Sequence, residues 1–302
     1  MPVNDSPTSH SRQKLFVLGV GAQKAGTTWL HRQLCTSPVF EPGFAKEYHT
    51  FDALFSPVCG SIRQRLLLAS QRVLRPDPSG HPGASAPPNS QHAKRLSFLE
   101  RPDNYFEYFD YLWLSQPGVE ATGDITPSYS TLDADAFQLI RTGLLAKGFS
   151  PKVIFLMRDP IERIWSMLRM DWRNRKQQLS FDEEMKRLLA SHQQDGVHLR
   201  TRYDRTLNTL EQVFEPDELC YGFYEDLFST AGFSPIQAFL DIPIPAPDFA
   251  TSVNASPKQE NILPRADVAA AIAHTYRSVY QEVQARFGDR ATRLWPGYQY
   301  LN

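Results

Sequence analysis

Lys24 lies in a run of small residues between an apolar strand, 16–20, and a helix that opens at Thr27. A strand–loop–helix with glycines in the loop directs free backbone N–H groups and the positive end of a helix dipole at one point, which is an anion site. Gly21 to Gly26 match the first part of the nucleoside triphosphate loop GxxxxGK[ST], but Thr27 stands where that loop has lysine. In that loop the lysine after the last glycine reaches the β- and γ-phosphates, and a lysine ahead of the last glycine cannot do so. The spacing therefore indicates a phosphate-bearing ligand other than ATP or GTP.

Arg158 is the second candidate, because it directly follows the strongly apolar run 152–157. An arginine in that position lies at the carboxyl edge of the sheet, where open α/β folds bind ligands. Ser166 lies two turns along the next helix, so its hydroxyl can face the same crevice. A forked cation and a hydroxyl suit a phosphate monoester. The alternative is that Arg158 forms an ion pair with Asp159 or Glu162 and only closes the turn.

Two anion sites at the ends of two strands indicate a ligand with phosphates at both ends, unless the first site is an ordinary glycine-containing turn. In these motifs the sequence resembles the sulfotransferases that use 3′-phosphoadenosine 5′-phosphosulfate (PAPS). Residues 23–30 resemble the family's 5′-phosphosulfate loop. Arg158-Asp159-Pro160 with Arg163 and Ser166 resembles its 3′-phosphate motif, in which the arginine and the serine bind the 3′-phosphate. The resemblance extends from about residue 15 to the terminal helix.

The resemblance implies PAPS as the donor and no metal. It also implies roles for Tyr203, in a helix near the adenine and the acceptor, and more weakly for Lys258. The latter stands in 254–259, where the animal enzymes carry a Lys-Gly-Arg loop; this sequence lacks that glycine and their late cysteine pair. The implied donor-binding residues are Lys24, Ala25, Gly26, Thr27, Thr28, Trp29, Arg158, Ser166, Tyr203 and Lys258.

Within the family, residues 46–52 are similar to the K-E-x-H-x-F-D stretch of the heparan sulfate-type enzymes, especially the 3-O-sulfotransferases. The carbohydrate branch is therefore the closest. The resemblance makes Glu47 the first candidate for the general base, with His49 as the alternative base or as its partner, and Asp52 as an orienting group. Lys24 would stabilise charge on the bridging oxygen. The implied acceptor is a hydroxyl or an amine on a saccharide or glycolipid, while a small metabolite, a lipid or a peptide tyrosine stay open.

Two other classes fit parts of the pattern. A nucleotide or small-molecule kinase shares the anion loop and the parallel sheet, but it needs a lysine after Gly26. A non-catalytic PAPS-binding protein needs neither a base nor a lysine at the bridging oxygen, and Lys24, Glu47 and Arg158 speak against it.

These residues require a sheet that brings the ends of several strands together. Apolar runs predict strands at 16–20, 119–124, 152–157 and 219–224, with helices between them. Such alternation predicts an α/β fold: a single domain over 15–302, with a central parallel sheet flanked by helices and a P-loop-like nucleotide-binding topology. A Pro-, Gly- and Ser-rich stretch predicts a mobile insertion at 75–98. We expect one terminal helix over 266–287.

Composition excludes several partners. The 302 residues carry a formal net charge of −1, which offers no electrostatic case for nucleic acid. Three widely separated cysteines argue against a disulfide framework and are typical of a reducing cytoplasm. The polar residues 1–14 predict a disordered lead-in, and no apolar run approaches the roughly 18 residues of a membrane span. The oligomeric state cannot be read from the sequence.

Overall fold

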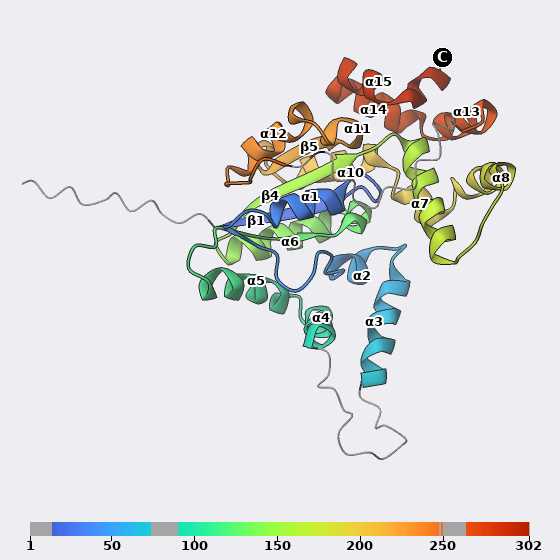
Figure 1. Ribbon diagram of the computed structural model, residues 1–302. Coiled ribbons are helices and arrows are strands. Elements are labelled where there is room, and N and C mark those ends of the chain that lie inside the picture. Colours follow the sequence, from blue (N-terminus) through green and yellow to red (C-terminus); the bar gives the residue numbers. More distant parts are fainter. Residues whose placement is uncertain (1–13, 74–89, 248, 250–263, 302) are drawn as a thin grey trace, which may run out of the picture.

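A computed structural model of the protein describes residues 14–73, 90–247, 249 and 264–301. Within this part of the chain, five strands form a parallel sheet flanked by helices (Figure 1). Their order is β2-β3-β1-β4-β5, so the strand before the Lys24 loop lies in the middle. The predicted α/β class and central parallel sheet are confirmed. The strands are β1 (Leu15–Gly21), β2 (Phe40–Glu41), β3 (Ala121–Ile125), β4 (Ser150–Met157) and β5 (Leu219–Phe223).

The central strand β1 is buried along its whole length and pairs with β3 on one side and β4 on the other. Leu18 stands opposite Asp124 in β3 and Val153 in β4. A strand buried on both faces must be apolar throughout, which explains the continuous apolar runs in the sequence. Because parallel strands end at the same edge, the segments 22–26 and 158–159 that follow β1 and β4 meet there.

Helices cover the sheet and extend beyond it. The α6 helix packs against β4, α5 against β3 and α12 against β5. Figure 1 shows α3 and α4 projecting on one side of the sheet, and α13, α14 and α15 gathered on the other. The helices are α1 (Thr27–Leu34), α2 (Phe51–Phe55), α3 (Gly60–Val73), α4 (Ser90–Glu100), α5 (Asp103–Ser115), α6 (Ala134–Ala146), α7 (Pro160–Asn174), α8 (Phe181–Ser191), α9 (Asp195–Leu199), α10 (Tyr203–Val213), α11 (Tyr224–Leu227), α12 (Thr230–Leu240), α13 (Ala266–Thr275), α14 (Arg277–Phe287) and α15 (Asp289–Leu294), with the 3₁₀ turns η1 (Pro127–Thr131), η2 (Pro216–Glu218) and η3 (Pro296–Tyr300).

We expected a mobile insertion at 75–98, but the structure differs over the second half of this range. Residues 90–98 belong to α4, which packs against α3 and α5, and Phe98 is buried among aromatic rings of α5. The proline-, glycine- and serine-rich composition ends before this helix, so the predicted insertion was too long at its C-terminal end. Residues 75–89 lie outside the described residues.

The two ends of the domain differ from expectation in detail. Lys14, assigned to the lead-in, is held by the sheet, since its carbonyl accepts the N–H of Ser150 and its ammonium pairs with Asp110 at 2.5 Å. Residues 1–13 lie outside the described residues. The terminal helix over 266–287 is two helices, α13 and α14, separated at the buried Tyr276. In the described part of the chain, no helix is long and apolar enough to cross a membrane.

Candidate active site

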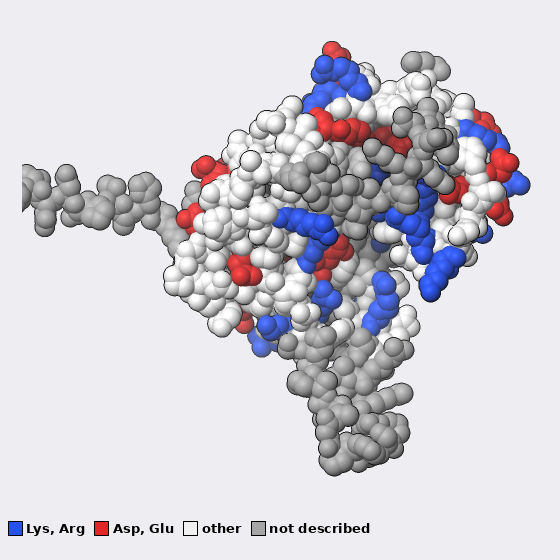
Figure 2. Space-filling view, viewed as in Figure 1, with Lys and Arg blue, Asp and Glu red and all other residues white. Residues whose placement is uncertain are grey.

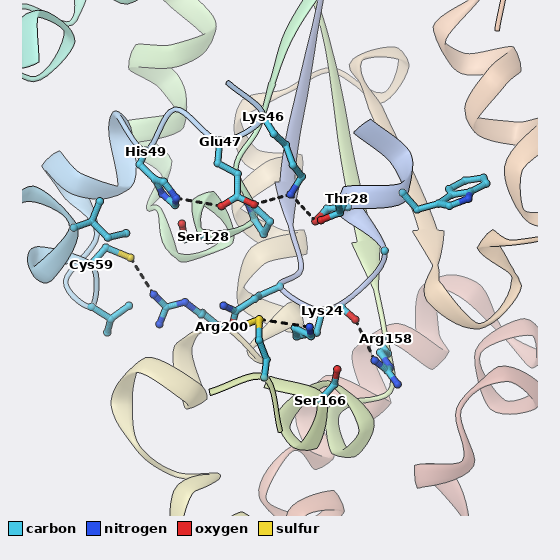
Figure 3. A pocket seen from close by; sticks show the side chains of 18 of the residues that line it. Lys24, Thr28, Lys46, Glu47, His49, Cys59, Ser128, Arg158, Ser166 and Arg200 are labelled. Carbon is cyan, nitrogen blue, oxygen red and sulfur yellow. Dashed lines mark hydrogen bonds and ion pairs between the residues drawn. The ribbon is translucent and has the colours of Figure 1, made fainter. Parts of the chain in front are cut away.

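A cavity of about 900 Å³ opens at the carboxyl edge of the sheet (Figure 3). Its wall combines the loop after β1, the segment 46–49, the α7 helix and the start of α3. The structure therefore brings together residues that the sequence placed in separate motifs. The predicted site residues that line the cavity are Lys24, Gly26, Thr27, Thr28, Trp29, Glu47, His49, Arg158 and Ser166.

The loop after β1 presents the N-terminus of α1 to the cavity. Gly26 is the cap of α1 and has φ +87°, and a Cβ there would lie 2.5 Å from Leu227 Cδ2. The N–H groups of a helix's first turn have no partner within the helix, so those of Thr27 and Thr28 can bind an anion. Ala25 differs from them, because it is fully buried and its N–H donates to the Ala22 carbonyl at 3.1 Å.

Lys24 is held at the cavity wall in the left-handed region, with φ +71°. Its ammonium donates to the thioether sulfur of Met170 at 3.6 Å and forms no ion pair with the described carboxylates. Burial, and then the charges of Arg173 and Arg158, lower the pKa of Lys24 below its usual value. A non-glycine residue at positive φ is uncommon and is a frequent feature of ligand sites. Lys24 is thus a partly desolvated cation available to an anion.

Arg158 faces the same space from the end of β4. One guanidinium nitrogen donates to the Lys24 carbonyl at 3.3 Å, another lies 3.3 Å from a Glu162 carboxylate oxygen, and the guanidinium stacks over the Tyr224 ring at 4.2 Å. The ion pair with Glu162 considered as an alternative therefore exists, and Arg158 lines the cavity as well. Ser166 lines it from two turns along α7, near Arg158 (Figure 3).

Other sequence-predicted residues lie elsewhere. Tyr203 is fully buried outside the cavity wall, and its hydroxyl donates to the Arg158 carbonyl at 3.0 Å. Trp29 lines the wall but is 1% exposed, and its ring packs against Phe228 and Phe233. Lys258 lies outside the described residues.

The support beneath Arg158 comes from the C-terminal part of the chain. The Asp159 carboxylate accepts hydrogen bonds from the Gly297 N–H at 2.7 Å, the Tyr280 hydroxyl at 3.0 Å and the Ile161 N–H at 2.9 Å. Complete burial raises the pKa of Asp159 to about 6. The N–H of Asp159 donates to Glu225 at 2.9 Å. The backbone that carries Arg158 is therefore fixed on several sides.

The Glu47 carboxylate faces the phosphate loop across the cavity and lies between two cations (Figure 3). Lys46 Nζ is 2.6 Å from one carboxylate oxygen and His49 Nε2 is 3.1 Å from the other, while His49 Nδ1 lies 2.8 Å from Asp52. Burial by itself raises the pKa of Glu47, but the hydrogen bond from His49 and the charge of Lys46 outweigh it and lower this pKa to about 2. Burial lowers the pKa of His49, yet its hydrogen bonds to Asp52 and Glu47 raise it to about 9.

This arrangement defines the charge states at the site. An imidazole with a carboxylate at each ring nitrogen has an N–H on both, which is the protonated form. Near neutral pH, Glu47 is a carboxylate and His49 an imidazolium. The buried Asp52 also accepts a hydrogen bond from the hydroxyl of Ser128.

Sequence reasoning missed several contributors to the wall. Lys46 reaches the phosphate loop, with its ammonium 3.4 Å from the Thr27 hydroxyl. Arg95 of α4 donates to the Glu47 carbonyl at 2.8 Å, and Arg200, which follows α9, donates to the Cys59 sulfur at 3.1 Å. Two of these residues had a local signal: Lys46 begins the 46–52 stretch, and Ser128 lies in a Thr-Pro-Ser-Tyr turn after the second predicted strand.

The fold and the wall define a class of protein. On one side the cavity has the backbone N–H groups of the loop together with Lys24. On the other side it has Arg158 and Ser166. Both sets are hydrogen-bond donors suited to a ligand with two phosphate groups. Across the cavity lies a carboxylate that can take a proton. This arrangement is suited to an α/β group-transfer enzyme that takes a ligand with two phosphate groups.

Comparison with known proteins agrees with this class. A sequence model described as the sulfotransferase family matches residues 16–245. The chain therefore belongs to the sulfotransferase family and is a sulfotransferase, and the family implies PAPS as the donor. No curated protein matches the chain.

A solved sulfotransferase structure shares the fold. The crystal structure of a sulfotransferase from Alicyclobacillus acidocaldarius is similar with a TM-score of 0.51 at 17% identity, covering 91% of this chain and 95% of that one. The sulfotransferase domain of the Synechococcus PCC 7002 olefin synthase is also similar, with a TM-score of 0.43 at 17% identity over 88% of this chain and 94% of that one.

Proposed function

We propose that the protein transfers a sulfuryl group from PAPS to a hydroxyl or amine of a saccharide or glycolipid acceptor. The observation that carries the proposal is that Lys24, Arg158 and Glu47 line one cavity of about 900 Å³. The saccharide part is supported by the similarity of 46–52 to the carbohydrate branch, together with the contacts that Glu47 and His49 make there.

The donor would be held at both ends by this chain's residues. The N–H groups of Thr27 and Thr28, with their hydroxyls, bind the 5′-phosphate, whereas Arg158 and Ser166 bind the 3′-phosphate. PAPS supplies an activated sulfuryl group when bound. Lys24 places its ammonium at the phosphate end, where it stabilises the negative charge that develops as the bridging oxygen leaves. Tyr203 positions Arg158 from behind through its carbonyl, and Lys258 stays a candidate donor contact.

Glu47 would accept the acceptor's proton. A bond forms between the acceptor oxygen and sulfur, the bond between sulfur and the phosphate oxygen breaks, and the proton passes from the acceptor hydroxyl to the Glu47 carboxylate. A carboxylate with a pKa of about 2 is a weak base toward a free hydroxyl. It suffices if the proton leaves late, because the hydroxyl becomes strongly acidic once its oxygen begins to bond to sulfur. His49, already protonated, orients Glu47 and does not compete with it.

The two other classes now rank lower. A kinase of the P-loop type lacks support, because Thr27 at the end of the loop is hydrogen-bonded to Lys46 and no lysine follows Gly26. A non-catalytic PAPS-binding protein would leave the Glu47 and His49 arrangement without a purpose.

Transfer from radiolabelled PAPS to a panel of saccharide and glycolipid acceptors tests the proposal, with products identified by mass spectrometry. We expect labelled product with the wild type, a large loss with Lys24→Ala and Glu47→Ala, and retained binding of the desulfated product adenosine 3′,5′-bisphosphate (PAP) by Glu47→Ala. Tight PAP binding without transfer to any hydroxyl or amine would contradict it. Loss of activity in His49→Ala with full activity in Glu47→Ala would instead make His49 the base.

A further inference from the structure

The cavity wall carries more positive charge than the donor motifs require. Its carboxylates are Glu47 and Glu162. Figure 2 shows Lys and Arg side chains gathered around the hollow of this face, although the chain as a whole has a net charge of −1. The cationic residues of the wall are Lys24, Lys46, Arg65, Arg95, Arg158, Arg169 and Arg200.

Three of these cations have no carboxylate partner among the described residues and belong to no donor motif. Three other cations of the wall form ion pairs: Lys46 with Glu47, Arg158 with Glu162, and Arg169 with Glu184. Within the described ranges the remaining arginines contact neutral groups: Arg65 the Ser61 carbonyl, Arg95 the Glu47 carbonyl and the Phe44 ring, and Arg200 the Gly196 carbonyl and the Cys59 sulfur.

The position of Arg200 separates it from the phosphate sites. In Figure 3, Arg200 and Cys59 lie on the side of the cavity that holds His49 and Ser128, whereas Arg158 and Ser166 lie on the other side. Arg200 is half-buried, and its guanidinium is oriented by the Gly196 carbonyl at 2.7 Å. A guanidinium held this way is pre-organised for an oxyanion.

The same side of the cavity has an apolar surface. Val58, Ile62 and Leu66, from the start of α3 and the segment before it, line the wall close to Cys59 in sequence and share it with Arg65. An apolar surface next to unpaired guanidinium groups fits an organic scaffold that carries an anionic group.

We propose that the acceptor carries an oxyanion, a carboxylate or a phosphate, which Arg200 and Arg65 bind while its hydroxyl faces Glu47. The inference rests on the proposed sulfuryl transfer and names the substrate class of that site. Arg95 contributes by holding the Glu47 backbone, which places the base between the donor loop and the anion. The oxyanion thereby positions the hydroxyl, and a neutral acceptor of the same shape lacks that anchor.

Binding to protein saturated with PAP tests this, because PAP occupies both phosphate sites. Phenyl phosphate, benzoate and phenol share a ring and differ in charge, and calorimetry measures each. We expect phenyl phosphate or benzoate to bind at least about tenfold more tightly than phenol, and the variant Arg65→Gln/Arg200→Gln to remove that difference. Whichever anion binds more tightly identifies the group as phosphate or carboxylate.

Arg63→Gln is the matched control, because Arg63 lies exposed on α3 outside the cavity wall. It should bind both anions as the wild type does. Unchanged PAP affinity in every variant shows that the fold and the donor site are intact. Equal affinity for phenol and the anions, or anion binding that survives Arg65→Gln/Arg200→Gln, would overturn the inference. Failure to bind PAP at all would instead contradict the proposed function.

Discussion

The guanidinium of Arg158 donates a hydrogen bond to the carbonyl oxygen of Lys24 at 3.3 Å, across 134 residues of sequence. The two residues follow neighbouring strands, β4 and β1, and represent the two anion motifs. The bond joins the backbone of one motif to the side chain of the other. A change at Arg158 is therefore expected to affect the loop that carries Lys24 as well as the ligand.

Arg158→Lys should weaken PAP binding by about tenfold to a hundredfold, because a point charge replaces a planar fork. Adenosine 5′-phosphate lacks the 3′-phosphate, so its affinity should change far less. Calorimetric titration with both nucleotides gives the comparison. Arg175→Lys, on the exposed C-terminal end of α7, is the control. An equal loss for both nucleotides would show that Arg158 acts only through the Lys24 loop.

Lys24→Ala should lower kcat by about 10²- to 10³-fold, which is the usual effect of removing one charge-stabilising donor. PAP affinity should fall much less, because Arg158 and Ser166 keep the other end. Lys176→Ala controls for the backbone, since Lys176 has φ +54° and is exposed outside the cavity. Steady-state kinetics with PAPS separates the two effects. A higher KM with an unchanged kcat would show that Lys24 does not stabilise the transition state.

The pair of Glu47 and His49 predicts a pH-dependent stability. The raised pKa of His49 contributes stability that is fully present below the usual value of about 6.5 and is lost as pH rises through about 9. The thermal unfolding temperature of the wild type should therefore exceed that of His49→Gln at pH 6, and the difference should shrink toward pH 9. A difference that does not vary with pH would mean that His49 is neutral in the folded protein.

The same pair distinguishes the two candidate bases in the reaction. With Glu47 as the base and a protonated His49 orienting it, kcat/KM should stay level across neutral pH and fall as His49 loses its proton near pH 9. With His49 as the base, kcat/KM should rise over the same interval. Initial rates between pH 6 and 10 at saturating PAPS decide between them.

Gly26→Ala should remove donor binding and destabilise the fold. Its φ of +87° costs a residue with a Cβ about 1–2 kcal/mol, and that Cβ would also meet Leu227 at 2.5 Å. Gly148→Ala isolates the first effect, because Gly148 has φ +74° and no atom within 4 Å of its Cβ position. Denaturant unfolding and PAP titration measure both variants. Equal losses of stability would mean that the Leu227 contact is relieved without cost.

The strands and the two anion motifs could be predicted because their signals are local. The apolar runs of β1 and β4 reflect burial on both faces, and each motif directly follows its strand. The two-residue β2 had no comparable signal, since Phe40–Glu41 is too short to show a period. The break at Tyr276 also escaped prediction, because no Gly or Pro marks it in the sequence.

Long-range contacts explain what was missed at the site. Arg95 lies in α4 and Arg200 directly follows α9, and no spacing in the sequence reveals how these helices pack. The charge states of Glu47 and His49 depend on the geometry of a short segment, since the distances to Lys46 and Asp52 are set by how 46–52 folds. The residue types within each short motif could therefore be read from the sequence, whereas the contributions of Arg95 and Arg200 to the cavity wall could not.

The hydrogen bond from Gly297 to Asp159 spans 138 residues and has a consequence for the order of assembly. The ribosome releases a chain from its N-terminus, so β1 and β4 can pair long before residue 297 is synthesised. Until then the Asp159 carboxylate lacks that donor, and the backbone bearing Arg158 is incompletely held. The site is therefore expected to bind nucleotide more weakly until residue 297 has left the ribosome, and a nascent chain arrested before Gly297 should be retained less on immobilised PAP than one arrested after it.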